Sequence, residues 1–201
     1  KIVKLLLART EIDVNQPDKD GCCPLLMACH NGDTENVKLL LARQEIDVNE
    51  PDNNGRSPLS IACHLGFTEI VKLLLATDET DVNQPNTRGA GSTPFYNACA
   101  NGHVDVVQLL LATKRVDINK SLNDGQSPLF AAAESGHVNL IAPLLAAGAD
   151  VHACVIDASS VDPSCSGLTP VGIASKNGHP EIVRMLNATK NASERVRLIK
   201  L

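Results

Sequence analysis

The chain has 201 residues, of which 43% are hydrophobic, and its formal net charge is −5 with no block of lysine or arginine. That length allows one or two globular domains or one array of small repeats, and the missing basic patch argues against nucleic-acid binding. No apolar run approaches the roughly 18 residues that a membrane-spanning helix needs, so we expect no membrane insertion. Aromatic residues make up only 2% of the chain, so the core must consist of Leu, Ile, Val and Ala, which suits closely packed helices.

The chain opens on KIVKLLLART, which has the apolar spacing of a second helix of a unit and is too short for a signal peptide. We therefore expect residues 1–15 to form an incomplete first unit of a longer protein. The phrase LLLARTEIDVN at 5–15 returns as LLLARQEIDVN at 39–49, LLLATDETDVN at 73–83 and LLLATKRVDIN at 109–119. Such recurrence at a nearly fixed interval indicates a repeat architecture.

The period is set by a proline that recurs in phase along the chain. The prolines are Pro24, Pro58, Pro94, Pro128 and Pro170, at intervals of 34, 36, 34 and 42 residues, and a glycine follows each one eight residues later. The period is thus 34 with two insertions, one at Ala90–Ser92 and a longer one within Ala153–Ser166. The predicted units after 1–15 are 16–49, 50–83, 84–119, 120–152 and 153–188, and 189–201 is expected to be a terminal cap or linker.

Each unit predicts two helices and a turn segment. A hydroxyl residue before the proline, as in Ser57–Pro58, suits the N-cap and first position of a helix; the same pair occurs at Thr93, Ser127 and Thr169. Cys23 lacks the hydroxyl, so its helix is expected to start less firmly. The first helix, about eight residues long, should end at the glycine in a left-handed conformation. A second helix with i, i+3, i+4 apolar spacing follows, and then D-V-N leads into a turn rich in Pro, Asn, Asp and Gly.

Three positions modify this scheme near the C-terminus. Pro143 lies inside a second helix and is expected to bend it and weaken residues 139–147. Pro180 lies at the start of a second helix, where proline is tolerated. Ser193 is expected to cap a separate short helix beyond the repeats.

The units resemble the ankyrin-repeat family. Its T-P-L-H-x-A motif appears as SPLSIA at 57–62, TPFYNA at 93–98, SPLFAA at 127–132 and TPVGIA at 169–174, and its second-helix segment appears as GHVDVVQLLL at 102–111. The resemblance implies an all-α ankyrin-repeat solenoid of stacked helix-turn-helix units joined by β-hairpin-like fingers. The histidine of the motif is replaced by Leu26, Ser60, Tyr96, Phe130 and Gly172. Some of the hydrogen bonds that this histidine makes in the family are therefore expected to be missing.

The resemblance also implies a non-catalytic module that binds a protein or peptide on its concave face, through finger tips and inner-helix positions just before the glycine. The alternative at any one position is a solvated side chain without a role. The finger-tip residues are Lys19, Asp20, Cys22, Asn53, Asn54, Arg56, Thr87, Arg88, Asn123, Asp124 and Gln126. The inner-helix residues are His30, Asn31, His64, Leu65, Ala100, Asn101, Glu134, Ser135, Lys176 and Asn177.

Two other functions stay open on the sequence. The chain is alternatively a regulatory or targeting domain of a larger enzyme, channel or effector. It also resembles the substrates of an asparaginyl hydroxylase, which recognises a Leu eight residues before an Asn. Asn15, Asn49, Asn83 and Asn119 have that spacing, although an asparagine that simply holds the turn explains the same pattern.

The seven cysteines bear on redox state and compartment. Cys29, Cys63 and Cys99 occupy equivalent places in successive units, about 10 Å apart in a helical stack, whereas a disulfide needs Cα atoms within about 7 Å. We expect reduced, buried thiols, hence a reducing compartment, the cytoplasm or alternatively the nucleus, and a monomer. His30 and His64 follow two of these cysteines, but adjacent helical side chains diverge by about 100°. No metal or cofactor is expected.

Overall fold

The computed structural model describes residues 9, 11–155 and 168–199, with side chains up to residue 189. These residues contain ten helices and no regular strand, so the predicted all-α solenoid is confirmed. The helices are α2 (Pro24–His30), α3 (Thr34–Leu41), α4 (Pro58–Leu65), α5 (Thr68–Leu75), α6 (Pro94–Ala100), α7 (Val104–Ala112), α8 (Pro128–Glu134), α9 (Val138–Ala146), α10 (Pro170–Lys176) and α11 (Pro180–Ile199).

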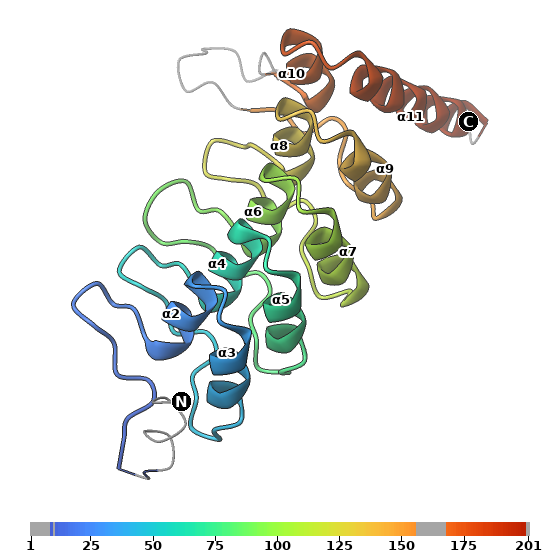
Figure 1. The fold of residues 1–201 in the computed structure, drawn as a ribbon. Coiled ribbons are helices and arrows are strands. Elements are labelled where there is room, and N and C mark those ends of the chain that lie inside the picture. The colour runs from blue at the N-terminus through green and yellow to red at the C-terminus, as the bar shows by residue number, and fades with distance from the viewer. Residues whose placement is uncertain (1–8, 10, 156–167, 200–201) are drawn as a thin grey trace.

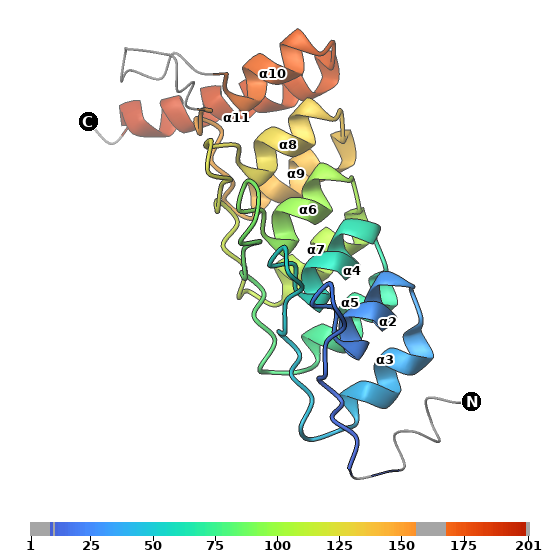
Figure 2. The ribbon, with the colours of Figure 1, turned by 90° about the vertical axis from the view of Figure 1, so that its left-hand side faces the viewer.

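The helices form two stacked layers (Figure 1). The inner layer is the row α2, α4, α6, α8 and α10, in which each helix packs on the next. The outer layer is the row α3, α5, α7, α9 and α11, which packs in the same order. The segments that lead from each outer helix to the next inner helix project beyond the inner layer as fingers, on one side of the array (Figure 2). Helices α2 and α11 lie at opposite ends of the array.

Each inner helix begins as the sequence predicts. Ser57 Oγ accepts a hydrogen bond from the backbone N–H of Ser60 at 3.2 Å, and the hydroxyls of Thr93, Ser127 and Thr169 do the same in their units. In α2 the sulfur of Cys23 takes this place, at 3.4 Å from the N of Leu26. Sulfur is a weak acceptor, so the cap exists but is weaker than a hydroxyl cap.

Four of the five glycines that follow the inner helices have two reasons to be glycine, as Gly66 illustrates. Gly66 has φ +74, a left-handed conformation that side chains disfavour. In addition, a Cβ on Gly66 would lie 2.5 Å from Nδ1 of His103 in the following unit. That imidazole sits there because its Nε2 is 3.0 Å from the carbonyl oxygen of His64. His137 and His179 make the same contact with the carbonyls of Ala100 and Glu134, so these histidines tie neighbouring units together.

The core lies between the two layers and runs through all units. Inner helices contribute small side chains, and Ala62, Ala98, Ala132 and Ala174 have no exposed surface. Outer helices contribute larger ones, such as Leu74, Leu110 and Leu144, which are also fully buried. Small residues on the inner layer let adjacent helices approach closely, so the core needs few aromatic residues.

The last two units follow the sequence predictions only in part. Helix α9 continues through Pro143 without interruption, and α11 begins at Pro180, as expected. The prediction of a separate helix capped by Ser193 is wrong, because α11 is one helix of 20 residues that includes Ser193 and crosses the expected border at 188/189. Residues 1–8 and 10 of the incomplete first unit and most of the long insertion, with Cys165, lie outside the described residues.

Candidate interaction surface

A continuous groove runs between the first three inner helices and the first three fingers. It consists of two adjoining hollows of about 490 and 350 Å³ that share His30, Arg56 and Ile61. The first hollow lies against α2 and the first fingers, and it includes Arg88 at the tip of the third. The second continues along α4 to Asn97 of α6. We call these two hollows together the concave groove.

The second finger is shaped by the buried carboxylate of Asp52. Its Oδ1 accepts hydrogen bonds from the backbone N–H groups of Asn54 and Arg56, each at 2.9 Å. Its Oδ2 accepts one from Nε of Arg56 at 2.8 Å. Burial alone would raise the pKa of Asp52, but the hydrogen bonds from Arg56 and the backbone outweigh it and lower that pKa. The Asp52 side chain is 1% exposed and the Arg56 side chain is 44% exposed. Of this ion pair, only the guanidinium group is therefore accessible to solvent.

Neighbouring fingers are joined by backbone hydrogen bonds, which fix the spacing of their tips. The N–H of Asn53 donates to the carbonyl of Asp20 at 3.2 Å, and the N–H of Arg88 donates to that of Asn54 at 3.0 Å. The N–H of Asn123 donates to the carbonyl of Ala90 at 2.8 Å. Finger tips that are bonded to one another present their side chains in a fixed row, although their sequences are those of turns.

Polar side chains that the sequence analysis did not select form a network on the helix side of the groove. Asn97 Nδ2 donates to Ser60 Oγ at 3.0 Å, Ser60 Oγ donates to Asn86 Oδ1 at 3.1 Å, and Asn86 Nδ2 donates to Ser92 Oγ at 2.9 Å. One signal was present, because Asn97 stands at a helix position where the other units have Met27, Ile61, Ala131 and Ile173. Ser92 belongs to the two-residue insertion, which therefore reaches the groove.

The structure brings together nine of the expected contact residues in the concave groove. They are Asp20, Cys22, His30, Asn53, Asn54, Arg56, His64, Leu65 and Arg88. The other expected residues do not line it. They are Lys19, Asn31, Thr87, Ala100, Asn101, Asn123, Asp124, Gln126, Glu134, Ser135, Lys176 and Asn177, and all are exposed or half-buried.

Several of the expected contact residues already have a structural partner. Asn53 and Asn123 donate from their amides to the carbonyls of Lys19 and Gly89 in the preceding finger. Asn177 donates to the carbonyl of Glu134 in the preceding inner helix. Asn101 donates to Asn97 O at 2.8 Å. These amides hold the scaffold, so their replacement would affect folding as well as any contact with a partner.

Four asparagines, three in D-V-N and Asn119 in D-I-N, form a ladder of hydrogen bonds between successive units. The side chain of Asn49 donates from Nδ2 to the carbonyl of Glu79 at 2.8 Å and accepts at Oδ1 from the N–H of Asp81 at 2.8 Å. Asn15, Asn83 and Asn119 make the same pair of bonds to the unit that follows each of them. This ladder shows why the asparagine recurs, and it is the structural explanation that the sequence left open.

Comparison with known families decides the assignment of the chain. Models of ankyrin repeats match residues 1–86 and 78–154, and a second ankyrin-repeat model matches residues 129–186. The chain belongs to the ankyrin-repeat family. A comparison with curated proteins found no match. Ankyrin repeats are generally protein–protein interaction modules and are typically non-catalytic.

The histidine of the ankyrin motif is replaced by polar side chains in some units and by residues without a polar side-chain atom in others. At two of its five positions the replacing side chain is polar and bonds to the next finger: Ser60 to Asn86, and Tyr96 OH to Gln126 Oε1 at 3.1 Å. At these two positions the replacing side chain therefore supplies a hydrogen bond to the next finger. Leu26, Phe130 and Gly172 have no polar side-chain atom, so such a bond is impossible there.

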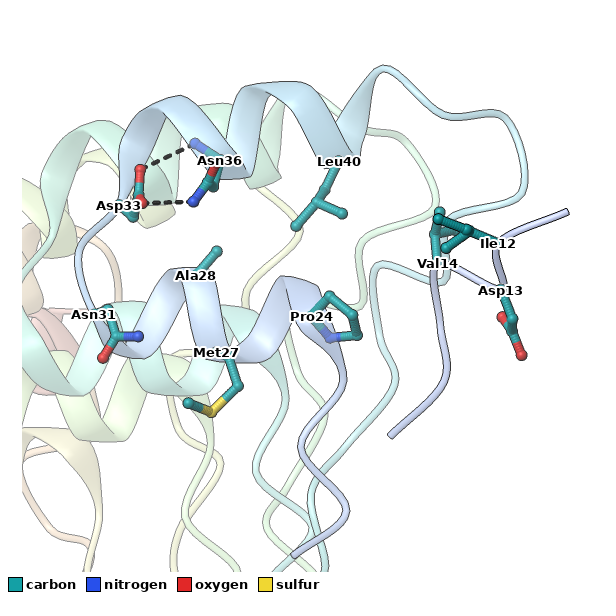
Figure 3. A pocket seen from close by; sticks show the side chains of 10 residues that line it. All are labelled: Ile12, Asp13, Val14, Pro24, Met27, Ala28, Asn31, Asp33, Asn36 and Leu40. Carbon is teal, nitrogen blue, oxygen red and sulfur yellow. Dashed lines mark hydrogen bonds between the residues drawn. The ribbon is translucent and has the colours of Figure 1, made fainter. Parts of the chain in front are cut away.

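A further hollow lies at the N-terminal end of the ankyrin array, where α2 and α3 face away from the other units (Figure 3). It measures about 250 Å³, and most of its lining is apolar, including Val14, Met27, Ala28 and Leu40. Asp33 lies at its margin, where it caps α3 by accepting from the N–H and the amide of Asn36. In the next unit the corresponding surface is covered by α2 and α3. Ile61, the counterpart of Met27, is only 4% exposed there, against 40% for Met27.

The cysteine column is buried in the inner layer, as predicted. Cys29, Cys63 and Cys99 have no exposed surface, and burial raises the pKa of Cys29 to about 12 and raises those of Cys63 and Cys99 further. Within the described residues, no three His, Cys, Asp or Glu side chains come together in a way that could hold a metal ion. The helices of this part of the chain also include none with the length and hydropathy needed to cross a bilayer.

Proposed function

We propose that this ankyrin array binds a protein partner, and that an extended segment of that partner lies in the concave groove. The observation that supports this most directly is the groove itself, which is formed jointly by inner helices and rigidly spaced fingers. Two of the three large apolar side chains that are exposed in the described part of the chain, Met27 and Leu65, line it. Exposed apolar side chains next to preformed polar groups are typical of recognition sites.

A displayed library of random peptides tests this function. We expect the wild-type array to enrich peptides, and Leu65→Gln and Asn54→Ala to weaken the enriched peptides by roughly three- to tenfold, because each removes one contact. Neither variant should change the thermal unfolding midpoint appreciably, since Leu65 is 38% exposed and the side chain of Asn54 has no partner among the described residues.

Two exposed outer-helix variants serve as controls, Lys38→Ala on α3 and Gln108→Ala on α7. They should leave peptide affinity unchanged. If they weaken binding more than the groove variants do, the partner uses the outer layer and the proposed surface is wrong.

Modification of the ladder asparagines by a hydroxylase stays a separate prediction. In their favour, Asn119 is exposed and Asn15, Asn49 and Asn83 are half-buried. Against easy access, each amide makes two hydrogen bonds to the following unit. A mass increase of about 16 Da, one added oxygen atom, on a peptide that contains Asn49 from the native source would establish it, and unmodified peptides at all four asparagines would reject it.

A further inference from the structure

We propose that the concave groove selects segments in which an aspartate or glutamate lies next to apolar residues, with Arg56 and Arg88 binding the carboxylate. This inference rests on the proposed function and names the chemistry of the partner. It follows from how charge, apolar surface and free hydrogen-bond donors are distributed along the groove.

The charges that the groove presents to solvent are mainly positive, although its lining contains both signs. The lining includes the carboxylates of Asp20 and Asp52 and the guanidinium groups of Arg56 and Arg88. Asp52 is buried, and its two oxygens are taken up by Arg56 and by backbone N–H groups. Arg88 is exposed, and its side chain has no partner among the described residues. A ligand therefore meets two guanidinium groups and one accessible carboxylate, that of Asp20.

Arg56 is held in place by a bond that leaves it able to bind a second carboxylate. Its Nε and one terminal nitrogen point to Asp52, with the terminal nitrogen 2.6 Å from Oδ2. A guanidinium has more N–H donors than these two contacts require. Because the group is planar and preoriented by Asp52, its remaining donors lose little freedom when they bind an incoming carboxylate.

Arg88 is held by its backbone instead of its side chain. Its N–H donates to the carbonyl of Asn54 in the second finger at 3.0 Å. The third finger is thus fixed against the second, and both arginines line the same hollow of about 490 Å³. A carboxylate in that hollow lies within reach of both side chains.

Apolar side chains flank the cations on the helix side. Met27 is 40% exposed on α2 and Leu65 is 38% exposed on α4, and Ile61 lines both hollows between them. A partner segment that follows the groove therefore meets apolar side chains near its acidic residue. Since the groove continues from α2 to α6 past the arginines, the segment passes through it, and an internal acidic side chain fits better than a chain terminus.

A phosphorylated segment fits less well. A phosphate carries close to two negative charges at neutral pH. The carboxylate of Asp20 lies in the same hollow, and the chain as a whole has a net charge of −5. Both oppose a dianion more than a single carboxylate.

The experiment repeats the selection from displayed random peptides with Arg88→Glu beside the wild type. We expect the peptides that are selected by the wild-type protein to be rich in Asp or Glu at a fixed spacing from an apolar residue. Arg88→Glu should weaken a synthetic copy of such a peptide by roughly 30-fold or more, since a favourable charged hydrogen bond becomes a repulsion. Peptides that are selected with the Arg88→Glu variant should contain Lys or Arg in place of the acidic residue. Replacing the acidic residue of the peptide by its amide should lower the affinity for the wild-type protein about tenfold, and the affinity for Arg88→Glu much less.

Lys38→Glu on α3 is the matched control, because it makes the same charge change at an exposed site outside the groove. It should retain wild-type affinity, and added salt should weaken the wild-type complex more than that of Arg88→Glu. Arg56→Ala is a poor test on its own, since it leaves the buried Asp52 unpaired and endangers the finger.

Three outcomes overturn the inference. If the selected peptides lack acidic residues and bind Arg88→Glu as well as the wild type, while Leu65→Gln still weakens them, the groove binds peptides but without this selectivity. If only phosphorylated versions of the peptides bind, the partner class is wrong. If no peptide depends on any groove residue, the proposed function fails together with this inference.

Discussion

At the scale of single residues, the glycines after the inner helices allow backbone strain to be measured separately from the steric clash of an added Cβ. Gly66 and Gly178 have nearly the same φ, +74 and +76, but a Cβ on Gly66 would strike His103 whereas one on Gly178 would meet nothing within 4 Å. We expect Gly178→Ala to cost about 1 kcal/mol of unfolding free energy from backbone strain alone. Gly66→Ala should cost about 1–2 kcal/mol more, because His103 must move and its bond to the carbonyl of His64 weakens. Urea unfolding of both variants measures the difference, and equal losses would contradict the steric argument.

The asparagine ladder gives a second residue-scale prediction. Asn49→Ala removes two side-chain hydrogen bonds to the next unit and should lower the free energy of unfolding by about 1–3 kcal/mol. The exposed Asn54 is a matched control, since Asn54→Ala removes the same side chain from the next finger without removing a bond that the structure describes. A change within about 0.5 kcal/mol is expected for this control. If both variants are equally stable in urea, the ladder does not stabilise the array.

At the scale of elements, Pro143 deprives helix α9 of one backbone hydrogen bond in its interior. The helix is continuous, but proline donates no N–H and therefore cannot form the helical bond that the other outer helices have at this place. Leu39, Leu73 and Leu109 are its counterparts. Pro143→Leu should stabilise the array by about 1–3 kcal/mol and slow amide hydrogen exchange in α9. Pro180→Leu is the control, because proline at the first position of α11 leaves no bond unmade; a similar gain there would show that the effect is not specific to the helix interior.

Most of the element pattern could be predicted from sequence because it depends on a few residues with a fixed role. Proline after a hydroxyl residue and glycine eight positions later set the start and end of each inner helix. The sequence does not predict one continuous α11 beyond residue 188, because Ser193 is of a type that often begins a new helix. Between Glu181 and Ile199 the sequence has neither glycine nor proline, and nothing else stops a helix as reliably.

The concave groove could be predicted only in part, for a different physical reason. Its position follows from the repeat, but some of its side-chain bonds join residues of different units, such as Ser60 to Asn86 and Asn97 to Ser60, which are 26 and 37 positions apart. Such pairs depend on the stacking of units and on finger shape, neither of which a single unit specifies. Asp52 and Arg56 are only four positions apart, but the sequence does not show that the carboxylate is buried while the guanidinium is exposed.

At the scale of the whole molecule, the units differ in how firmly they are joined to the next one. The ladder runs from Asn15 to Asn119, and His152 stands where a further asparagine would be. The last helix pair, α10 and α11, is joined to the array by packing on α8 and α9 and by the bonds of Asn177 and His179 to Glu134. In a linear array, stability is approximately a sum of unit and interface contributions. We therefore expect amide hydrogens of α10 to exchange faster than those of α4 and α6, and equal protection would contradict this.

The buried thiols of Cys29, Cys63 and Cys99 can report the order in which the units of the array unfold. Each thiol is sealed in one inner helix, so an alkylating reagent can reach it only after that helix separates from its neighbours. The protein is alkylated during mild denaturation, and samples taken at successive times are digested. The extent of alkylation at each cysteine then gives the time at which each of three consecutive units opens. Simultaneous labelling at the three sites would mean that α2, α4 and α6 open as one block, and a staggered pattern would reveal the direction in which opening spreads. The protein needs no introduced probe for this, because its sequence has already placed one in each of three neighbouring units.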